Sequence, residues 1–286
     1  MNFTSDPATT ANRVEMLRRY MAGNVLDPTG RCVCRNLGGC RRSTLFTREG
    51  ARRSEAVFAE AQLSHVGRHY DLAYNGKSWR ILVVAIETGR PRAGVTLDER
   101  RAEVLESAAL RFGNRNPHMK GVTSALRLAV GRAPGDDLGG EFLRMRDGRA
   151  YVHLFDAYAM ANLRLCSVIA GNAGKSLGNA TMDRNCLPHL AATVKTLRPT
   201  FCIVQGAGLY RALDPLMANR RPLGPHLEQV EVAGVNMLVA ALTHPSARGI
   251  HRWGALTGVP YLYETVTPTI AAAHRLLVEG RGLGRQ

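Results

Sequence analysis

Five of the six cysteines fall into two groups whose spacing suits a metal centre. Cys32, Cys34 and Cys40 lie in a stretch rich in glycine and arginine, whereas Cys166 and Cys186 lie far along the chain, with Cys186 in the first turn of an expected helix. Loop thiols gathered from two distant segments are typical of a four-thiolate site for zinc or an iron–sulfur cluster. Scattered free cysteines are the alternative, because neither group contains C-x-x-C. The sixth cysteine, within TFCIV, is expected to be a small buried side chain.

Three further residues carry side chains that could perform chemistry, and each follows an apolar stretch. Glu87 comes after RILVVAI and could orient or activate a water molecule. Asn162 offers a donor and an acceptor, enough to read the edge of a base or an amide. His244 opens a basic segment that contains Arg248, Arg252 and a tryptophan, a mixture typical of sites that grip phosphates and bases. The plain alternatives are a loop acid, a loop-capping asparagine and a solvated helix face.

The elements that must position these residues follow an α/β pattern. Apolar stretches rich in β-branched residues predict core strands that are buried on both faces, in RILVVAI, Tyr151–Phe155, Thr200–Val204 and Val235–Leu242. Helices are predicted between them, at Asn12–Met21, Leu97–Arg111, Val122–Val130, Asp183–Leu197 and Pro268–Glu279, with Thr267 as the N-cap of the last. This alternation predicts a three-layer α/β/α fold around a central four-stranded parallel sheet.

Two hairpins complete the predicted pattern. Tyr70–Tyr74 is expected to pair with Trp79–Ile86 through an Asn-Gly turn, and Gln229–Val232 with Val235–Leu242. We expect one domain over residues 1–286, of which residues 1–52 form an irregular N-terminal segment that carries cysteines. The carboxyl ends of parallel strands meet at one edge of a sheet. Residues 87–89, 159–162, 205–208 and 244–248 are therefore expected to lie together.

The charge of the chain favours a polyanionic partner. Its 286 residues include 38 Lys and Arg against 23 Asp and Glu, a net charge of +15, and nearly all the cations are arginine. Nucleic acid is the commonest partner of such a protein, and a basic protein without one is the alternative. No apolar run is long enough to cross a bilayer, and residues 1–20 do not resemble a signal peptide. We expect a cytoplasmic, nucleoid-associated protein without a membrane partner.

Taken together, these segments resemble the uracil-DNA glycosylase superfamily, and most closely its iron–sulfur branch. The strongest stretch runs over residues 162–206, where five positions of that branch match in order, namely Asn162, Cys166, Cys186, Pro199 and Gly206. THPSARGI is similar to the His-Pro-Ser motif of the superfamily, and ILVVAIETG falls where its first catalytic motif belongs. HMKGVTSAL resembles the segment that follows the base-stacking aromatic. The resemblance spans roughly residues 30–278.

The resemblance implies a DNA glycosylase that hydrolyses the N-glycosidic bond of uracil or another deaminated base, flipped out of the helix. Glu87 would orient the water and stabilise the oxocarbenium-like sugar, and Asn162 would read the base edge. His244 would donate to the departing base or to a nearby phosphate. Met119 or His118 would pack on the face of the base.

The same resemblance implies DNA contacts and a metal. Ser246, Arg248, Arg252 and Gln205 are expected to touch the DNA, with Arg248 as the plug for the gap that the flipped base leaves. A structural [4Fe-4S] cluster, or zinc as the alternative, would be held by Cys166 and Cys186 with two of Cys32, Cys34 and Cys40. Cys40 with one of the other two is expected, because C-x-C chelation of one cluster is sterically tight. We expect a monomer.

The chain also departs from the superfamily pattern. Ala85 and Ile86 stand where Gly-Gln or Gly-Glu precedes the catalytic acid, and Met119 stands where a stacking phenylalanine is normal. These changes leave the excised base open. Two other functions stay open as well: a non-catalytic nucleic-acid-binding protein on the same fold, and a zinc protein that acts on another glycosidic bond.

Overall fold

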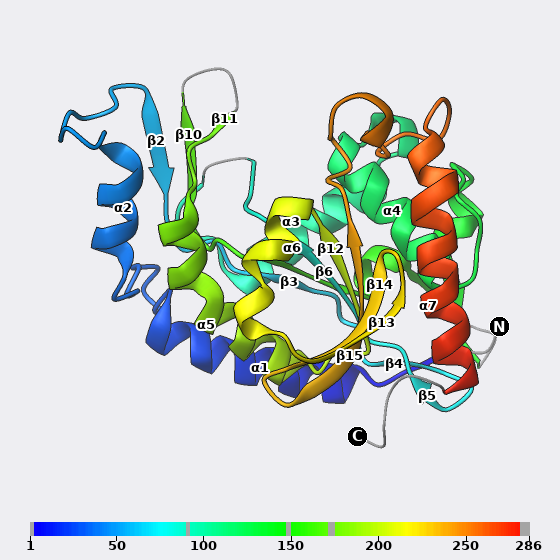
Figure 1. Cartoon of the computed structure of the whole chain (residues 1–286). Helices are drawn as coiled ribbons and strands as arrows, with labels where there is room; N and C mark the ends of the chain where they lie inside the picture. Colours follow the sequence, from blue (N-terminus) through cyan, green and yellow to red (C-terminus); the bar gives the residue numbers. More distant parts are fainter. Residues whose placement is uncertain (1–2, 90–91, 147–149, 171–174, 281–286) are drawn as a thin grey trace.

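Seven described strands hydrogen-bond into one central sheet, and these are β13 (Ala218–Gly224), β14 (Leu227–Val232), β15 (Val235–Leu242), β12 (Phe201–Gln205), β6 (Ile81–Ala85), β9 (Ala159–Asn162) and β3 (His65–Val66), in that order (Figure 1). The computed structural model describes residues 3–89, 92–146, 150–170 and 175–280. The pairings of β15 with β12, β12 with β6 and β6 with β9 are parallel. The outer pairings are antiparallel. The protein is therefore mixed α/β, with a wider and more mixed sheet than the sequence predicts.

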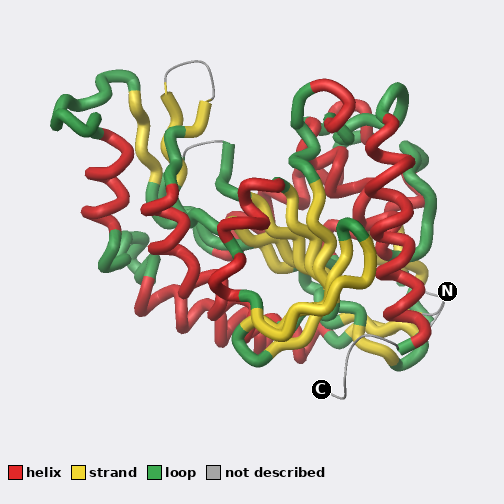
Figure 2. The backbone as a smooth tube through the Cα atoms, in the orientation of Figure 1, coloured by secondary structure: helices red, strands yellow, loops and turns green. Residues whose placement is uncertain are grey.

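Side chains of the central strands alternate between two apolar cores, which explains why these strands are apolar throughout. In β6, Ile81 and Val83 enter one core and Leu82 and Val84 the other. The first is the α4/α7 core, which α4 (Pro117–Ala129) and α7 (Thr267–Glu279) complete. The second is the α1/α5 core, which α1 (Pro7–Asn24), α5 (Ala180–Leu197) and α6 (Ala207–Ala212) complete. Figure 2 shows the strands between these two groups of helices.

The remaining elements surround this core. Helix α3 (Leu97–Ala109) packs on β3 and begins with a capping box between Thr96 and Glu99, as the acidic first turn of the predicted helix suggests. Smaller sheets are formed by β1 (Phe3–Ser5), β4 (Leu72–Tyr74) and β5 (Lys77–Ser78); by β2 (Ala56–Ala59), β10 (Ser167–Ala170) and β11 (Lys175–Ser176); and by β7 (Phe142–Arg144) and β8 (Tyr151–His153). Short helical turns occupy Phe112–Asn114, Leu138–Glu141, Leu154–Asp156, Asp214–Leu216, Gly249–His251 and Leu262–Val266.

The N-terminal segment is more regular than predicted. The expected helix extends at both ends as α1, because Asp6 caps it by accepting the Thr9 N–H at 2.9 Å and a proline occupies its first position. The stretch expected to be irregular also contains α2 (Leu37–Leu45), which has two glycines in its first turn. Packing compensates for this poor helix propensity, since Cys40 and Thr44 are buried against the neighbouring elements.

The predicted second core strand is wrong in position. Tyr151–His153 forms β8, which pairs with β7 outside the central sheet. The chain then makes a helical turn at Leu154–Asp156, where Asp156 accepts the Arg68 backbone N–H at 2.8 Å. On the side of β6 away from β12, the paired strand is β9, whose last residue is Asn162. Its four residues, AMAN, are too short and too small to give a strand signal of their own.

Two local predictions also need correction. The Asn75-Gly76 turn forms with positive φ at both residues, but it joins β4 to the two-residue β5, and the chain then enters the central sheet at Ile81. Thr267 does not cap the last helix, because the π-helical turn before it runs directly into α7. Its hydroxyl donates instead to the Leu262 carbonyl at 2.7 Å. Among the described helices, none is long and apolar enough to span a bilayer.

Candidate functional site

The carboxyl ends of the parallel strands place four residues in one row. Ala85 pairs with Asn162, Gln205 pairs with Leu242, and Val84 pairs with Val204 one step earlier. Residues 162, 85, 205 and 242 therefore form the last row of the sheet, called the edge row here. Side chains alternate along a strand, so the edge row faces the α4/α7 core, as Ile203 and Leu242 do. Two amide side chains thus flank the small Ala85, two strand spacings or about 10 Å apart.

Asn162 is oriented by a neighbour beyond the end of β6. Its Nδ2 donates to Thr88 Oγ1 at 2.9 Å, and the side chain is partly buried. The Thr88 carbonyl in turn accepts the Ser167 hydroxyl at 2.8 Å. This contact fixes the amide plane and leaves Oδ1 and one N–H of Asn162 for another partner. The structure therefore places Asn162 where the sequence predicts it, with a donor and an acceptor at the edge row.

Glu87 directly precedes Thr88 in the chain, and its side chain contacts Arg164. Its side chain is only 6% exposed, and its Oε2 lies 3.3 Å from Arg164, which also binds Asp183 at 2.6 Å. Burial raises the pKa of the Glu87 carboxyl, although hydrogen bonds from Ser176 and the charge of Arg164 oppose the shift. Glu87 is thus a buried carboxylate with a raised pKa, held by an arginine that sequence reasoning did not single out.

Two imidazole rings stack above the edge row. His118, in the first turn of α4, and His244, just after β15, have ring centroids 5.6 Å apart and planes inclined by 17°. His118 Nε2 lies 3.5 Å from the sulfur of Met160, which sits one row below Asn162 on β9. Burial, with a smaller effect of His244, lowers the pKa of His118 to about 4, and burial lowers the pKa of His244 as well. Both rings are therefore neutral near pH 7.

The hydrogen bonds of His244 define which nitrogen can donate. Its Nδ1 accepts the backbone N–H of Ser246 at 3.1 Å, so the proton of the neutral ring lies on Nε2. The loop that carries His244 is fixed against α4, because a Cβ at Gly121 would lie 2.5 Å from Pro245 and 3.2 Å from Trp253. Only glycine allows this approach. The resulting Nε2–H is a positioned neutral donor.

Two predicted site residues, Met119 and Gln205, and the tryptophan of the basic segment are buried. Met119 is 5% exposed and packs in the α4/α7 core, because α4 begins at Pro117 and turns this side chain inward. It cannot stack on a base, whereas its neighbour His118 is partly exposed. Gln205 is fully buried and cannot touch a DNA backbone. Trp253 is also fully buried, and its Nε1 donates to the Thr243 carbonyl at 2.8 Å, so it anchors the loop.

The predicted DNA-contacting residues of this loop are exposed. Ser246, Arg248 and Arg252 all lie on its surface, in the segment after β15 that stands at the carboxyl end of the strands (Figure 1). The loop also carries Ile250, which is 67% exposed. An exposed large apolar side chain beside arginines is suited to insertion between bases. The sequence signal for Ile250 was its isolation between Gly249 and His251 in a basic segment.

The five candidate metal cysteines come together from three segments. Helix α2 packs on α5, Cys40 and Cys166 share a small apolar cluster, and Asn185 Nδ2 donates to Cys40 Sγ at 3.3 Å, next to Cys186 in the chain. Burial raises the pKa of Cys166, and the Cys186, Cys32 and Cys40 thiols add to the shift. Burial also raises the pKa of Cys186 to about 12, with contributions from Cys40 and Cys34. Such mutual effects need short distances.

Backbone N–H groups lie beside two of these thiols. Hydrogen bonds from the backbone of Leu165 and Ala61 reach the Cys186 and Cys166 sulfurs and lower their pKa values. Within the described ranges, no three His, Cys, Asp or Glu side chains are arranged so that they could hold one metal ion. Sequence reasoning missed His189, whose Nε2 lies 3.9 Å from Cys34 Sγ and whose Nδ1 lies 3.0 Å from the Tyr20 hydroxyl.

No known protein-family model matches the chain, and no curated protein is similar enough to count as a relative.

Proposed function

We propose that the protein is a DNA glycosylase that hydrolyses the N-glycosidic bond of uracil or another deaminated base. The observation that carries this proposal is the edge row: an oriented Asn162 amide lies on the face over which the neutral His118 and His244 rings stack. A base needs a donor–acceptor edge to be read and a face to stack on. The four parallel strands β15, β12, β6 and β9 then serve as the core of a uracil-DNA glycosylase-like fold, with β3, β13 and β14 as additions.

Binding begins with a base flipped out of the DNA stack. The free Oδ1 and N–H of Asn162 pair with adjacent donor and acceptor atoms of the base, and Thr88 keeps the amide from rotating. His118 packs on the face of the base, a role that the sequence analysis assigned to either His118 or Met119. Its low pKa keeps the ring uncharged, so it stacks as an aromatic surface.

His244 acts on the leaving base. As the glycosidic bond breaks, negative charge develops on the carbonyl oxygens of the base, and a positioned donor stabilises it. The Nε2–H of His244 is that donor, because Nδ1 is occupied by the Ser246 N–H. A neutral donor whose pKa is lowered by burial keeps its proton and stabilises the anion by hydrogen bonding. The protonated ring is not required.

Glu87 acts on the opposite side of the bond. Its carboxylate orients the attacking water and faces the positive charge that develops on the sugar. Arg164 keeps the carboxyl ionised against the effect of burial, and the raised pKa makes it a better proton acceptor than an exposed glutamate. The water proton passes to Glu87 as the hydroxyl adds to the sugar C1′, and the base leaves with the electrons of the C1′–N bond.

The loop after β15 holds the DNA. Ser246, Arg248 and Arg252 contact phosphates, and Arg248 or the exposed Ile250 fills the gap left by the flipped base. The net charge of +15 supports binding to a polyanion. Trp253 and Pro245 hold this loop on α4, so that DNA contact and the position of His244 are set by one rigid segment.

A structural [4Fe-4S] cluster completes the proposal. Its ligands would be Cys40, Cys166, Cys186 and either Cys32 or Cys34, which come from α2 and the segment before it, the residue just before β10 and the first half of α5. Four cysteine thiolates are the ligand set that a [4Fe-4S] cluster takes. When bound, the cluster ties the N-terminal segment to the core. Hydrolysis needs no redox step.

The proposal is tested by incubating anaerobically purified protein with oligonucleotides that carry uracil, hypoxanthine or xanthine, single- and double-stranded. Release of at least one free base is expected, together with iron and a brown colour. Binding of the oligonucleotides without release of any base from iron-loaded protein would identify a non-catalytic nucleic-acid-binding protein instead. Colourless active protein that contains zinc would contradict the cluster and leave the glycosylase in place.

A further inference from the structure

The segment around α2 carries a disproportionate share of the positive charge. Residues 31–53 contain seven arginines and a single acid, whereas the whole chain has 38 Lys and Arg against 23 Asp and Glu. Two of these arginines form ion pairs, Arg31 with Asp27 and Arg41 with Glu60. The others are exposed and have no ion pair within the described residues, and these are Arg35, Arg42, Arg48, Arg52 and Arg53. Their guanidinium groups are therefore available to bind phosphate.

The turn between α2 and β2, residues 46–53, is called the arginine turn here. Backbone hydrogen bonds close it, and its two sides meet at an antiparallel bridge between Phe46 and Arg52. Phe46 is 37% exposed, and Arg48 and Arg52 are exposed on the same short turn. Glu49 is the one acid among these residues. An exposed aromatic ring among arginines is typical of surfaces that contact nucleic acid.

The loop after β15 has a similar composition. Its Ile250 is 67% exposed and lies between the exposed Arg248 and Arg252. Each of the two segments thus presents a large apolar side chain with two arginines. Figures 1 and 2 show the two segments on opposite sides of the carboxyl ends of the central strands, and both project beyond those ends. A long polyanion that crosses the strand ends can contact both segments.

Hydrogen bonds and strand pairing fix the height of the arginine turn above Asn162. Thr88 accepts the Asn162 amide through its hydroxyl and the Ser167 hydroxyl through its carbonyl. Strand β10 runs away from the central sheet from Ser167 to Ala170, and Ala170 pairs with Ala56, which lies three residues past the arginine turn (Figure 1). Three steps of an antiparallel strand span about 10 Å. In DNA the major groove is about 8.5 Å deep, so the phosphates lie at a similar height above a base edge.

We propose that the arginine turn is a second DNA-binding surface, which binds backbone phosphates a few nucleotides away from the flipped base. This inference rests on the proposed glycosylase function, because that function places DNA over the edge row. Arg48 and Arg52 bind phosphates through paired N–H groups, and Phe46 packs on a sugar or a base. Asn179, the N-cap of α5, donates to the Ser43 carbonyl at 2.9 Å and holds α2 in place. The folded protein therefore sets the spacing between the base site and the second surface.

The test measures DNA affinity by fluorescence anisotropy for the double variant Arg48→Ala/Arg52→Ala. On a duplex of about 20 base pairs with a central uracil, Kd should rise about 5- to 20-fold. The slope of log affinity against log salt should decrease by about 2, one for each lost phosphate contact. On a short oligonucleotide with about two nucleotides on either side of the uracil, Kd should stay within about twofold of wild type.

The matched control is Arg144→Ala/Arg275→Ala, which removes two exposed arginines from β7 and α7, beside the α4/α7 core. Its Kd should stay within about twofold of wild type on both DNA lengths. Equal losses in the two double variants would overturn the proposal, because net charge alone would then explain the effect. An equal loss on short and long DNA would also overturn it, because the contact would then not lie on the flanking nucleotides.

Base release from the same samples separates this inference from the proposed function. Release by the wild-type protein together with wild-type affinity in Arg48→Ala/Arg52→Ala would refute the arginine turn and leave the glycosylase in place. DNA binding without any release, but with the length-dependent loss in the variant, would refute the glycosylase and support the second surface. A wild-type protein that neither binds DNA nor releases a base would refute both.

Discussion

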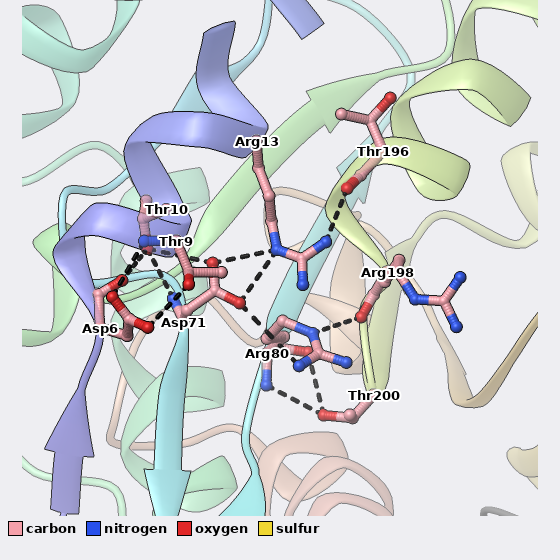
Figure 3. A network of polar contacts seen from close by, with 9 residues as sticks. All are labelled: Asp6, Thr9, Thr10, Arg13, Asp71, Arg80, Thr196, Arg198 and Thr200. Carbon is pink, nitrogen blue, oxygen red and sulfur yellow. Dashed lines mark hydrogen bonds and ion pairs between the residues drawn. The ribbon is translucent and has the colours of Figure 1, made fainter. Parts of the chain in front are cut away.

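The two ends of the parallel strands differ in the partners of their buried polar groups. At the amino ends, Asp71 is 8% exposed and accepts Arg13 Nε at 3.0 Å and the Thr10 hydroxyl at 3.1 Å, with Arg80 at 3.9 Å (Figure 3). The Arg80 backbone N–H donates to the Thr200 hydroxyl at 3.0 Å, which ties the starts of β6 and β12 together. At the carboxyl ends, Gln205 is unpaired within the described residues.

This difference separates stability from function within one sheet. A buried ion-pair network fixes the fold, whereas a buried polar group without a partner lowers stability. The amino ends, with the ion pairs of Asp71, are called the closed end here and the carboxyl ends the open end, although the buried Tyr70 hydroxyl beside Asp71 also has no partner within the described residues. The neutral His118 and His244 and the buried Glu87 belong to the open end, where burial shifts each pKa away from its ordinary value.

The largest expected effect is at Glu87. Glu87→Gln removes the carboxylate proposed to orient water, and kcat for base release should fall about 10³-fold, while DNA affinity and Tm change little. Single-turnover release and a gel shift measure the two quantities. Asp183→Asn is the matched control, because Asp183 binds the same Arg164. An equal loss in Asp183→Asn would show that Glu87 acts only by holding Arg164.

The closed end should show the reverse pattern. Asp71→Ala leaves Arg13 and Arg80 buried without their carboxylate and should cost about 3 kcal/mol of unfolding free energy. kcat/KM of the folded variant should stay within about twofold of wild type. Urea denaturation and base release measure the two effects. Glu15→Ala removes an exposed pair with Arg18 and should change little. A large fall in kcat for Asp71→Ala would show that the closed end contributes to activity as well as to stability.

The open end should also make the protein sensitive to acid. The pKa of His118 is about 4 in the folded protein and near 6.5 when unfolded, so the unfolded chain binds the proton more tightly. The stabilisation is complete above about pH 6.5 and is lost as the pH falls toward about 4. On acidification from about pH 7 to about pH 5, the titration of His118 should lower the free energy of unfolding by about 2 kcal/mol.

Denaturant titrations of wild type and His118→Leu at these two pH values isolate this effect. The difference between the two proteins removes the contribution of His65, whose buried ring also has a pKa lowered to about 3. His118→Leu should lose less stability than wild type on acidification. Identical pH dependence in both proteins would show that His118 titrates as it does in the unfolded chain.

Much of this arrangement was readable from the sequence because it depends on local signals. The apolar runs of β6, β12 and β15 predicted core strands, and the end of β15 placed His244 at the carboxyl edge. Asn162 lies at the same edge, although the strand predicted before it, Tyr151–Phe155, is wrong. The expectation that Glu87 lies beside this edge also agrees with the structure, through Thr88. These elements need only periodicity and the rule that parallel strands end together.

The rest depended on tertiary packing. β9 is too short to give a strand signal of its own, and α2, with two glycines in its first turn, is stabilised by packing on α5. Met119 is buried because α4 starts at Pro117, five residues before the predicted start at Val122. In this helix, His118 is turned outward instead. Gln205 looked like a surface residue after a strand, and only the packing of the α4/α7 face shows that it is buried. No local pattern reports these outcomes.

The smallest expected effect is on DNA affinity. Arg248→Ala removes one exposed cation of the loop after β15, and DNA affinity should fall a few-fold. The slope of log affinity against log salt should decrease by about 1, and kcat at saturating DNA should stay within about twofold. Fluorescence anisotropy at several salt concentrations measures this. An unchanged slope would place Arg248 away from the phosphates.

The central claim is that chemistry belongs to the edge row, and Asn162→Ala tests it most directly. Base release from xanthine- and uracil-containing oligonucleotides should be measured under single-turnover conditions, with DNA affinity measured on the same samples. Wild type should release base, whereas Asn162→Ala should be slower by at least about 10²-fold with near wild-type DNA affinity and Tm. Release by Asn162→Ala at the wild-type rate would contradict the account.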